Sequence, residues 1–220
     1  MSNLNQNLLA DIDPEISDRL VANRRAFFKT SALKLGAMAS APVVLAMSAQ
    51  NAFGAELPKD IVDVLVFALT LEHIEDAFYR TGLETHGLIP DKYVGIFNQI
   101  GKHEAAHVAF LTSALGSAAI KRPRLDLTAG GKFGDVLSNF DTYLTLSQTF
   151  EDLGVAAYKG QAGNLIANDG ILTAALQIHS VEARHAAIVR KIGGKKPWDG
   201  AFDEPKTKQE VLDAAGPFLA

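Results

Sequence analysis

The sequence contains no cysteine among its 220 residues. This absence excludes disulfide bonds, thiolate catalysis, cysteine-ligated iron–sulfur clusters and zinc sites built on cysteine. Histidine, aspartate and glutamate remain as the side chains that can bind a metal ion strongly. The length fits one domain with a short appendage.

A strong excess of one charge is also missing. The formal net charge is −4 at pH 7, and the basic residues Lys121, Arg122 and Arg124 fit a solvated loop. We therefore expect no nucleic-acid partner. Long apolar runs are scarce too: residues 30–49 are weakly apolar but are interrupted by Lys34 and Pro42. This run is too short and too mixed for a membrane span.

The N-terminus has the features of a targeting segment. Paired Arg24 and Arg25 precede Phe27, Phe28 and Lys29, and the weakly apolar run follows. This order resembles a bacterial twin-arginine export signal, and the alternative is an amphipathic helix with an accidental arginine pair. We expect a signal over residues 1–55, the twin-arginine translocation machinery as partner, and a periplasmic or exported protein. Small residues at 49–55 suit cleavage, and a membrane contact is expected only for an uncleaved signal.

Helical periodicity dominates the chain after the signal. Four long helical segments are predicted, and sustained period-2 alternation typical of strands is not found. The loops between the first two and the last two segments are short, whereas a long Gly-rich stretch joins the second to the third. The segments run over about 59–83, 91–117, 134–163 and 169–192. The boundaries predicted for them are Pro90-Asp91, caps at Asp135 and Asp169, and an end at Gly193-Gly194.

Each predicted helix carries a glutamate in the middle of its apolar stripe, and the second and fourth add a histidine one turn later. A lone carboxylate in a protein interior is costly, so it must be paired, protonated or bound to a metal. Four glutamates and two histidines converging on one interior are suitable ligands for iron, manganese or zinc. The residues are Glu72, Glu104, His107, Glu151, Glu182 and His185.

The same residues form an internal repeat. Glu72 is followed seven residues later by Tyr79, and Glu151 is followed seven later by Tyr158. Glu-x-x-His then follows in both halves, 32 residues after the first glutamate and 31 after the second. Seven residues are almost two helical turns, so each tyrosine lies on the face of its glutamate. There each tyrosine is expected to hydrogen-bond a ligand carboxylate of the other half.

This pattern resembles the ferritin-like di-iron carboxylate superfamily over residues 58–192, in which two helices give one Glu each and two give Glu-x-x-His. The resemblance implies an all-α four-helix bundle at 56–193, built of two helical hairpins joined by a long crossover. A tail at 194–220 would carry a short helix near 206–214. It also implies two metal ions, iron first, with manganese or an iron/manganese pair as alternatives, and Glu104 and Glu182 as bridging carboxylates. With the signal, the chain is similar to exported ferritin-like proteins related to desiccation-associated proteins.

The stretch HEAAH at 103–107 allows another interpretation. His-Glu-x-x-His on a helix is typical of zinc proteases, with both histidines as ligands and Glu104 as the base. The second half, however, has Val181 at the position equivalent to His103. That interpretation also leaves three interior glutamates unexplained. We therefore expect His103 to flank the site.

Several other residues near the predicted site can be explained without a role as metal ligands. Glu75 lies one turn from Glu72 and is an alternative to it or a partner in its role. The preferred expectation is that Glu75 forms a charged pair with Asp76 or Arg80 beside the site. His73 and His86 are expected at the surface. His179, one turn before Glu182, is expected to cap or pack, and Gly154 to allow close helix packing or leave room for dioxygen or peroxide.

The expected function is a redox-active metal centre that acts on O2, peroxide or Fe(II) and protects against metal or oxidative stress. The alternatives are disproportionation of peroxide, as in manganese catalases, and a structural or storage metal site without turnover. An electron chain of the rubrerythrin type is excluded within this chain, because its cysteine-ligated iron is missing. A monomer or homodimer is expected rather than a shell.

Overall fold

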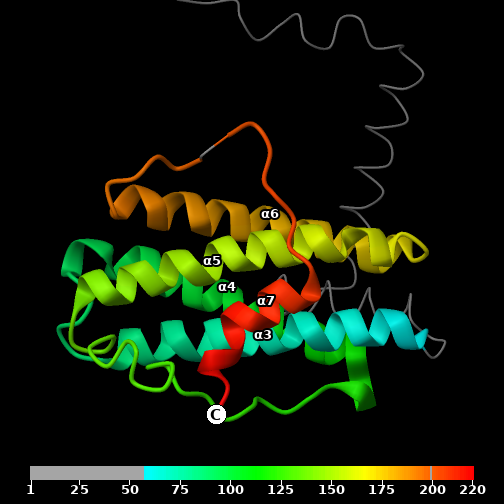
Figure 1. Cartoon of the computed structure of the whole chain (residues 1–220), viewed down its shortest axis with the longest axis horizontal. Coiled ribbons are helices and arrows are strands. Elements are labelled where there is room, and N and C mark those ends of the chain that lie inside the picture. Colours follow the sequence, from blue (N-terminus) through cyan, green and yellow to red (C-terminus); the bar gives the residue numbers. More distant parts are fainter. Residues whose placement is uncertain (1–56, 199) are drawn as a thin grey trace, which may run out of the picture. The chain divides into compact units, whose positions relative to one another are not determined.

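Four long helices and one short helix make up the described part of the chain (Figure 1). The computed structural model describes residues 57–198 and 200–220, so the expected signal at 1–55 lies outside the described residues. Within them no strand is formed, and an isolated bridge joins Leu125 to Leu219. The helices are α3 (Lys59–Glu84), α4 (Asp91–Leu115), α5 (Phe140–Gln161), α6 (Asp169–Ile192) and α7 (Lys208–Ala215), with 3-10 turns η1 (Gly116–Ala118), η2 (Ala162–Leu165) and η3 (Gly216–Phe218).

Side-chain caps mark the starts of α5, α6 and α7, and they correct two of the predicted caps. The prediction that α4 begins at Pro90-Asp91 is confirmed, but α6 is capped by Asn168, which accepts from the Ile171 amide at 3.0 Å. Helix α5 begins at Phe140 after the cap Asn139, several residues later than predicted. Asp135 instead accepts a hydrogen bond from the Asn139 side chain at 2.9 Å. A side-chain acceptor at the cap satisfies an amide that the first helical turn leaves free.

The predicted all-α bundle of two hairpins is confirmed. Helix α3 packs along α4, α5 packs along α6, and α3 also touches α5. The crossover at 116–139 connects the hairpins, and the four long helices lie roughly alongside one another in Figure 1. In the part of the chain that the structure describes, no helix has the length and apolar character needed to cross a membrane.

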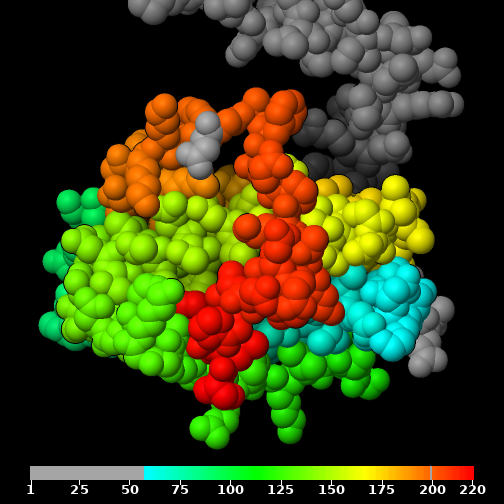
Figure 2. Space-filling view, in the orientation of Figure 1, coloured from blue at the N-terminus to red at the C-terminus, as the bar shows by residue number. Residues whose placement is uncertain are grey.

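The C-terminal tail closes the bundle. Helix α7, which begins with a capping box of Thr207 and Glu210, packs against α5. The chain then runs beside the crossover, where the Asp126 amide donates to the Phe218 carbonyl at 2.9 Å. Figure 2 shows this segment lying across one face of the bundle. Since Phe218 is buried, the tail is part of the core.

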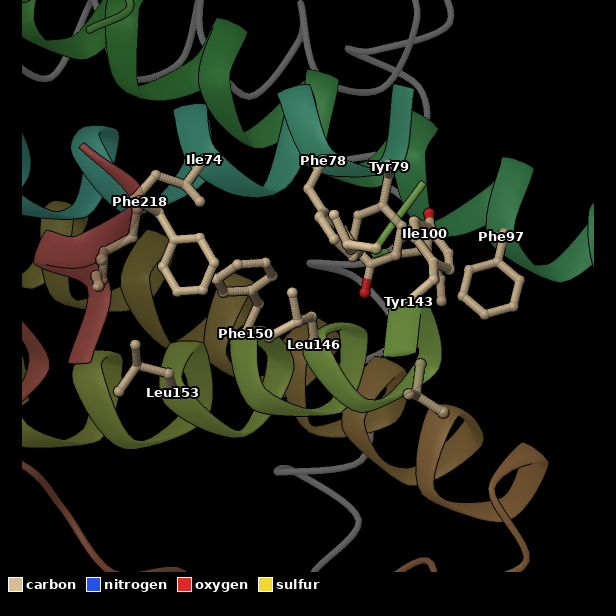
Figure 3. Packing of buried hydrophobic residues seen from close by; sticks show 14 of the residues in the cluster. Ile74, Phe78, Tyr79, Phe97, Ile100, Tyr143, Leu146, Phe150, Leu153 and Phe218 are labelled. Carbon is tan, nitrogen blue, oxygen red and sulfur yellow. The ribbon is translucent and has the colours of Figure 1, made fainter. Parts of the chain in front are cut away.

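Two hydrophobic clusters fill the interior. An aromatic cluster includes the stacked rings of Phe78 and Tyr143, 4.5 Å apart, with Phe150 and Phe218 beside them (Figure 3). An aliphatic cluster gathers at the other end of the helices, around the buried Leu69 and other residues of α3, α4 and α6. Burial of each large apolar side chain contributes on the order of 2 kcal/mol. Along α4 and α6, the predicted site residues lie between the two clusters.

Candidate metal centre

The six side chains predicted from the sequence meet in the interior of the bundle. All four glutamates are completely buried, and the two histidines are almost so. Each of the four long helices supplies one glutamate, and α4 and α6 each add the histidine one turn later. The 3.6-residue period places the two residues of each Glu-x-x-His on one helix face.

Their donor atoms form two overlapping groups. Within each group the four donor atoms all lie within 4.8 Å of one another. Glu104 and Glu182 belong to both groups, which is the position expected of carboxylates that bridge two ions. The first group is Glu72, Glu104, His107 and Glu182, and the second is Glu104, Glu151, Glu182 and His185.

The ring nitrogens face too many oxygens for ordinary hydrogen bonding. His107 Nδ1 lies 3.0 Å from Glu104 Oε2, 3.1 Å from Glu182 Oε1 and 3.2 Å from Glu72 Oε2. A ring nitrogen carries at most one hydrogen, so it can donate to one of these oxygens and leaves the others unpaired. Such convergence of a nitrogen with several carboxylate oxygens is the arrangement that a central cation satisfies.

Unpaired buried atoms support the same conclusion. No described residue gives a well-formed hydrogen bond to Glu104 Oε1, Glu151 Oε2, either oxygen of Glu182 or His185 Nδ1. His185 Nδ1 does lie 2.9 Å from Glu104 Oε1, but without hydrogen-bond geometry. Each unsatisfied buried group costs about 1–3 kcal/mol, and more when it is charged. Two cations would satisfy these atoms together, so the residues fit a di-metal site.

Two tyrosines hold carboxylates of the opposite half. The Tyr158 hydroxyl donates to Glu72 Oε1 at 2.5 Å, and the Tyr79 hydroxyl donates to Glu151 Oε1. These are the cross-connections that the repeat predicts. Each bond fixes one oxygen of a glutamate and leaves the second oxygen directed at the histidines, at 3.2 Å in both cases.

His103 contacts a histidine of the site and stays outside both groups. Its Nδ1 lies 2.8 Å from His185 Nε2, and the two rings stack 5.1 Å apart at 13°. A metal ion on His185 Nδ1 would leave the ring hydrogen on Nε2, where His103 accepts it. The other ring nitrogen of His103, Nε2, lies 2.7 Å from Gln99 Nε2. His103 and His107 therefore do not converge as the ligands of a zinc protease would.

The electrostatics show how much positive charge the interior needs. Burial raises the pKa of Glu182 well above its usual range, and Glu104 adds to the shift. Burial also raises the pKa of Glu104 to about 7, although the close approach of both histidines opposes it. Burial would lower both histidine pKa values, but the facing carboxylates raise that of His107 well above normal and that of His185 to about 10. Without a metal, protons neutralise the cluster.

The charged pair expected for Glu75 is not formed. Asp76 pairs with Arg80 at 3.6 Å, while Glu75 is only 4% exposed. Burial, followed by repulsion from Glu182, raises the pKa of its carboxyl well above the usual range. Gly154 lies opposite: a β-carbon there would be 3.4 Å from Glu75 Oε1. The position of Glu75, three residues after Glu72, is the signal behind the alternative role given to it from the sequence.

The remaining histidines lie outside both groups. His86 is exposed, as expected. His73 is expected at the surface, but the crossover residues Ile120 and Arg122 lie near it and its side chain is 7% exposed. Burial lowers the pKa of His179, and its charged neighbours are on α5 and in the tail rather than in the metal site.

Comparison with known proteins agrees with this arrangement. The family model described as ferritin-like domain matches residues 60–195, which covers all four long helices except the first residue of α3. No curated protein matches the sequence.

Proposed function

Because the chain belongs to the family of ferritin-like domain proteins, we propose that its buried glutamates and histidines bind two metal ions, iron first, as a redox-active centre. The observation that carries this proposal is the pair of four-donor groups that share Glu104 and Glu182. The proposed substrates are O2, peroxide or Fe(II), and the proposed role is protection against metal or oxidative stress.

Charge supports two ions rather than one. Four carboxylates carry a charge that two divalent cations balance, and the histidines are neutral when they bind metal. A single divalent ion would leave two uncompensated charges in an interior where such charges are costly. Bound iron would supply two electrons, which together with two protons reduce one peroxide to two water molecules as both ions become trivalent.

The residues of the chain position and protect this chemistry. Tyr79 and Tyr158 fix one oxygen each of Glu151 and Glu72, so those carboxylates keep their orientation when the charge of the centre changes. The hydrophobic clusters on either side keep bulk water out. His103 orients the His185 ring and faces a groove between α4 and α6, which gives small molecules a route towards the site.

Metal counting tests the proposal directly. Protein loaded with Fe(II) without oxygen should bind two ions per chain, and Glu104→Ala combined with Glu182→Ala should abolish binding at both positions. Glu84→Ala, an exposed acid at the end of α3, is the control. A count below two in the wild type, or a count that the double substitution leaves unchanged, would refute a di-metal centre.

Turnover then separates the three activities considered. Oxidation of bound Fe(II) coupled to peroxide loss supports the iron reaction. Oxygen release from peroxide by the manganese-loaded protein, without release by the iron-loaded protein, would instead select disproportionation. Metal-dependent thermal stability without any turnover would select a structural or storage site.

We also propose export by the twin-arginine route. Its support is the sequence order of Arg24, Arg25, the two phenylalanines, Lys29 and the weakly apolar run. This route carries folded proteins, which suits a protein that takes up its metal before transport. Arg24→Lys with Arg25→Lys should keep the protein in the cytoplasm on cell fractionation, whereas Lys29→Arg should not. Equal export of both variants would contradict the proposal.

A further inference from the structure

The two halves of the bundle differ at one position beside the metal centre. The repeat that pairs Glu72 with Glu151 and Tyr79 with Tyr158 also pairs position 75 with position 154. Position 75 holds a glutamate and position 154 a glycine. The α3–α4 half therefore brings a fifth carboxyl group that the α5–α6 half lacks.

The glycine makes room for this carboxyl group. A β-carbon on Gly154 would lie 3.1 Å from Glu182 Oε2 and 3.4 Å from Glu75 Oε1. Both oxygens thus lie over the same point of α5. A β-carbon there would crowd the Glu182 oxygen and would be in van der Waals contact with the Glu75 oxygen.

Glu75 has no partner of its own. Among residues 57–198 and 200–220, none hydrogen-bonds or forms an ion pair with its carboxyl group, which is buried. On its outer side is a cavity with about 10 Å³ for the centre of a water molecule, room for about one. The other residues that line this cavity are Leu71, Ile74, Phe150, Leu153, Gly154 and Ala215.

A buried carboxyl group without a partner is costly to keep. The largest effects of neighbouring charges on Glu75 come from four carboxylates, with Glu182 first, and all four are repulsive. Alanine or leucine would fill the same helical position without this cost. The position makes physical sense when a cation occupies the neighbouring site, because the cation is then the partner.

We infer that Glu75 is an additional carboxylate ligand of the metal centre, placed beside Glu182 and fitted to Gly154, and that it favours a trivalent over a divalent ion. The inference rests on the proposed di-metal function. Four carboxylates balance two divalent ions, so a fifth balances the extra charge when one ion is trivalent. Glu75 lies outside both four-donor groups, and the missing side chain at Gly154 leaves its Oε1 and Glu182 Oε2 next to the same point of α5.

Two redox-inert ions test this without any turnover. Co(II) alone probes divalent binding, and Ga(III), supplied as its citrate complex, probes trivalent binding. Glu75→Gln keeps the volume of the side chain and removes its charge. Asp76→Asn is the matched control, because it removes a neighbouring acid that pairs with Arg80 at the surface. Binding is measured by competition and by metal content after gel filtration.

Wild type, Glu75→Gln and Asp76→Asn should each bind two Co(II) ions with affinities within about threefold. Glu75→Gln should bind Ga(III) at least about tenfold more weakly than wild type, since one charge at short range is lost, while Asp76→Asn should match wild type. Gly154→Ala crowds Glu182 Oε2 and brings a methyl group into contact with Glu75 Oε1, so it should weaken Ga(III) binding in the same direction.

Equal Ga(III) affinity of wild type and Glu75→Gln, with two Co(II) ions bound in both, would overturn the inference and leave the di-metal centre intact. Failure of the wild type to bind two Co(II) ions would instead overturn the proposed function. Gly154→Ala reports on the same contact through a different residue, so the inference stays falsifiable if Glu75→Gln does not fold.

Discussion

The α3–α4 half and the α5–α6 half of the bundle supply equal shares of the six predicted metal ligands and unequal sets of polar groups beside them. The equivalent pairs are Glu72 and Glu151, Tyr79 and Tyr158, Glu104 and Glu182, and His107 and His185. The differences are Glu75 against Gly154 and His103 against Val181. Both extra polar groups come from α3–α4, and both lie beside ligands of α6. The repeat thus builds a symmetric cluster of donor atoms, and the departures from it would make the two proposed metal positions chemically different.

The largest expected effect, a loss of bound metal, comes from removing a carboxylate that belongs to both donor groups. Glu104→Ala removes a donor from both groups and should reduce the bound metal from two ions towards none. Glu72→Ala and Glu151→Ala each remove a donor from one group, so each should leave about one ion. Metal content after gel filtration measures the difference. The same loss for all three variants would show that the groups are not separate positions.

The pH dependence of stability should be opposite with and without metal. In the metal-free protein the folded state raises the pKa of Glu104 to about 7 and that of His185 to about 10, so it holds more protons than the unfolded chain. Its free energy of unfolding should therefore fall as pH rises, from about 4.5 to 7 through Glu104 and from about 6.5 to 10 through His185. The slope is up to about 1.4 kcal/mol per pH unit for each extra proton.

Metal binding displaces these protons, so added Co(II) should stabilise the protein more as pH rises towards 8. Urea unfolding at pH 5, 6, 7 and 8, with metal and with chelator, measures both trends. Metal-free stability that increases over this range would contradict the proton-neutralised cluster.

Substitution of the two tyrosines tests whether the equivalent hydrogen bonds of the two halves contribute equally to stability and to metal binding. Tyr79→Phe and Tyr158→Phe each remove one donor from a buried carboxylate, which should cost about 1–3 kcal/mol in the free energy of unfolding. Weaker metal binding, by about 10–100-fold, should accompany each change. Denaturant unfolding and metal titration should give similar values for the two variants. Tyr143→Phe, outside the site, should leave metal binding unchanged.

The smallest effect should come from the pair His103 and Val181, the second position at which the two halves differ. His103→Ala removes the acceptor for His185 and should weaken one of two metal-binding steps by about tenfold. Val181→Ala, at the equivalent position of the other half, should leave both steps unchanged. Calorimetric titration with Co(II) resolves the steps. Equal effects of the two substitutions would mean that His103 does not distinguish the metal positions.

Apolar periodicity was enough to predict the helices, and it failed where apolar residues pack from outside a helix. The predicted start of α5 near residue 134 is too early because Phe133, Val136 and Leu137 pack against the aromatic cluster from irregular turns. Their spacing imitates a helical stripe. The irregular turns end where Asn139 caps α5. Asparagine and aspartate are both good cap residues, so the sequence alone does not show whether Asn139 or Asp135 caps the helix.

The six converging side chains could be predicted because each lies on the main apolar stripe of its helix. Glu75 could not be placed in the same way, since whether a carboxyl group beside the stripe is buried depends on what the facing helix offers. The empty space at Gly154 belongs to α5, far away in the sequence. His73 is similar, because the crossover that covers it is a non-local contact.

The last residues of the chain have a consequence for how the protein is made. Val211 and Phe218 are buried in the aromatic cluster, and the Ala220 amide donates to the Arg124 carbonyl at 2.9 Å. The aromatic cluster is therefore incomplete until residues 211–220 have left the ribosome. The four long helices should complete their packing only after this segment has emerged.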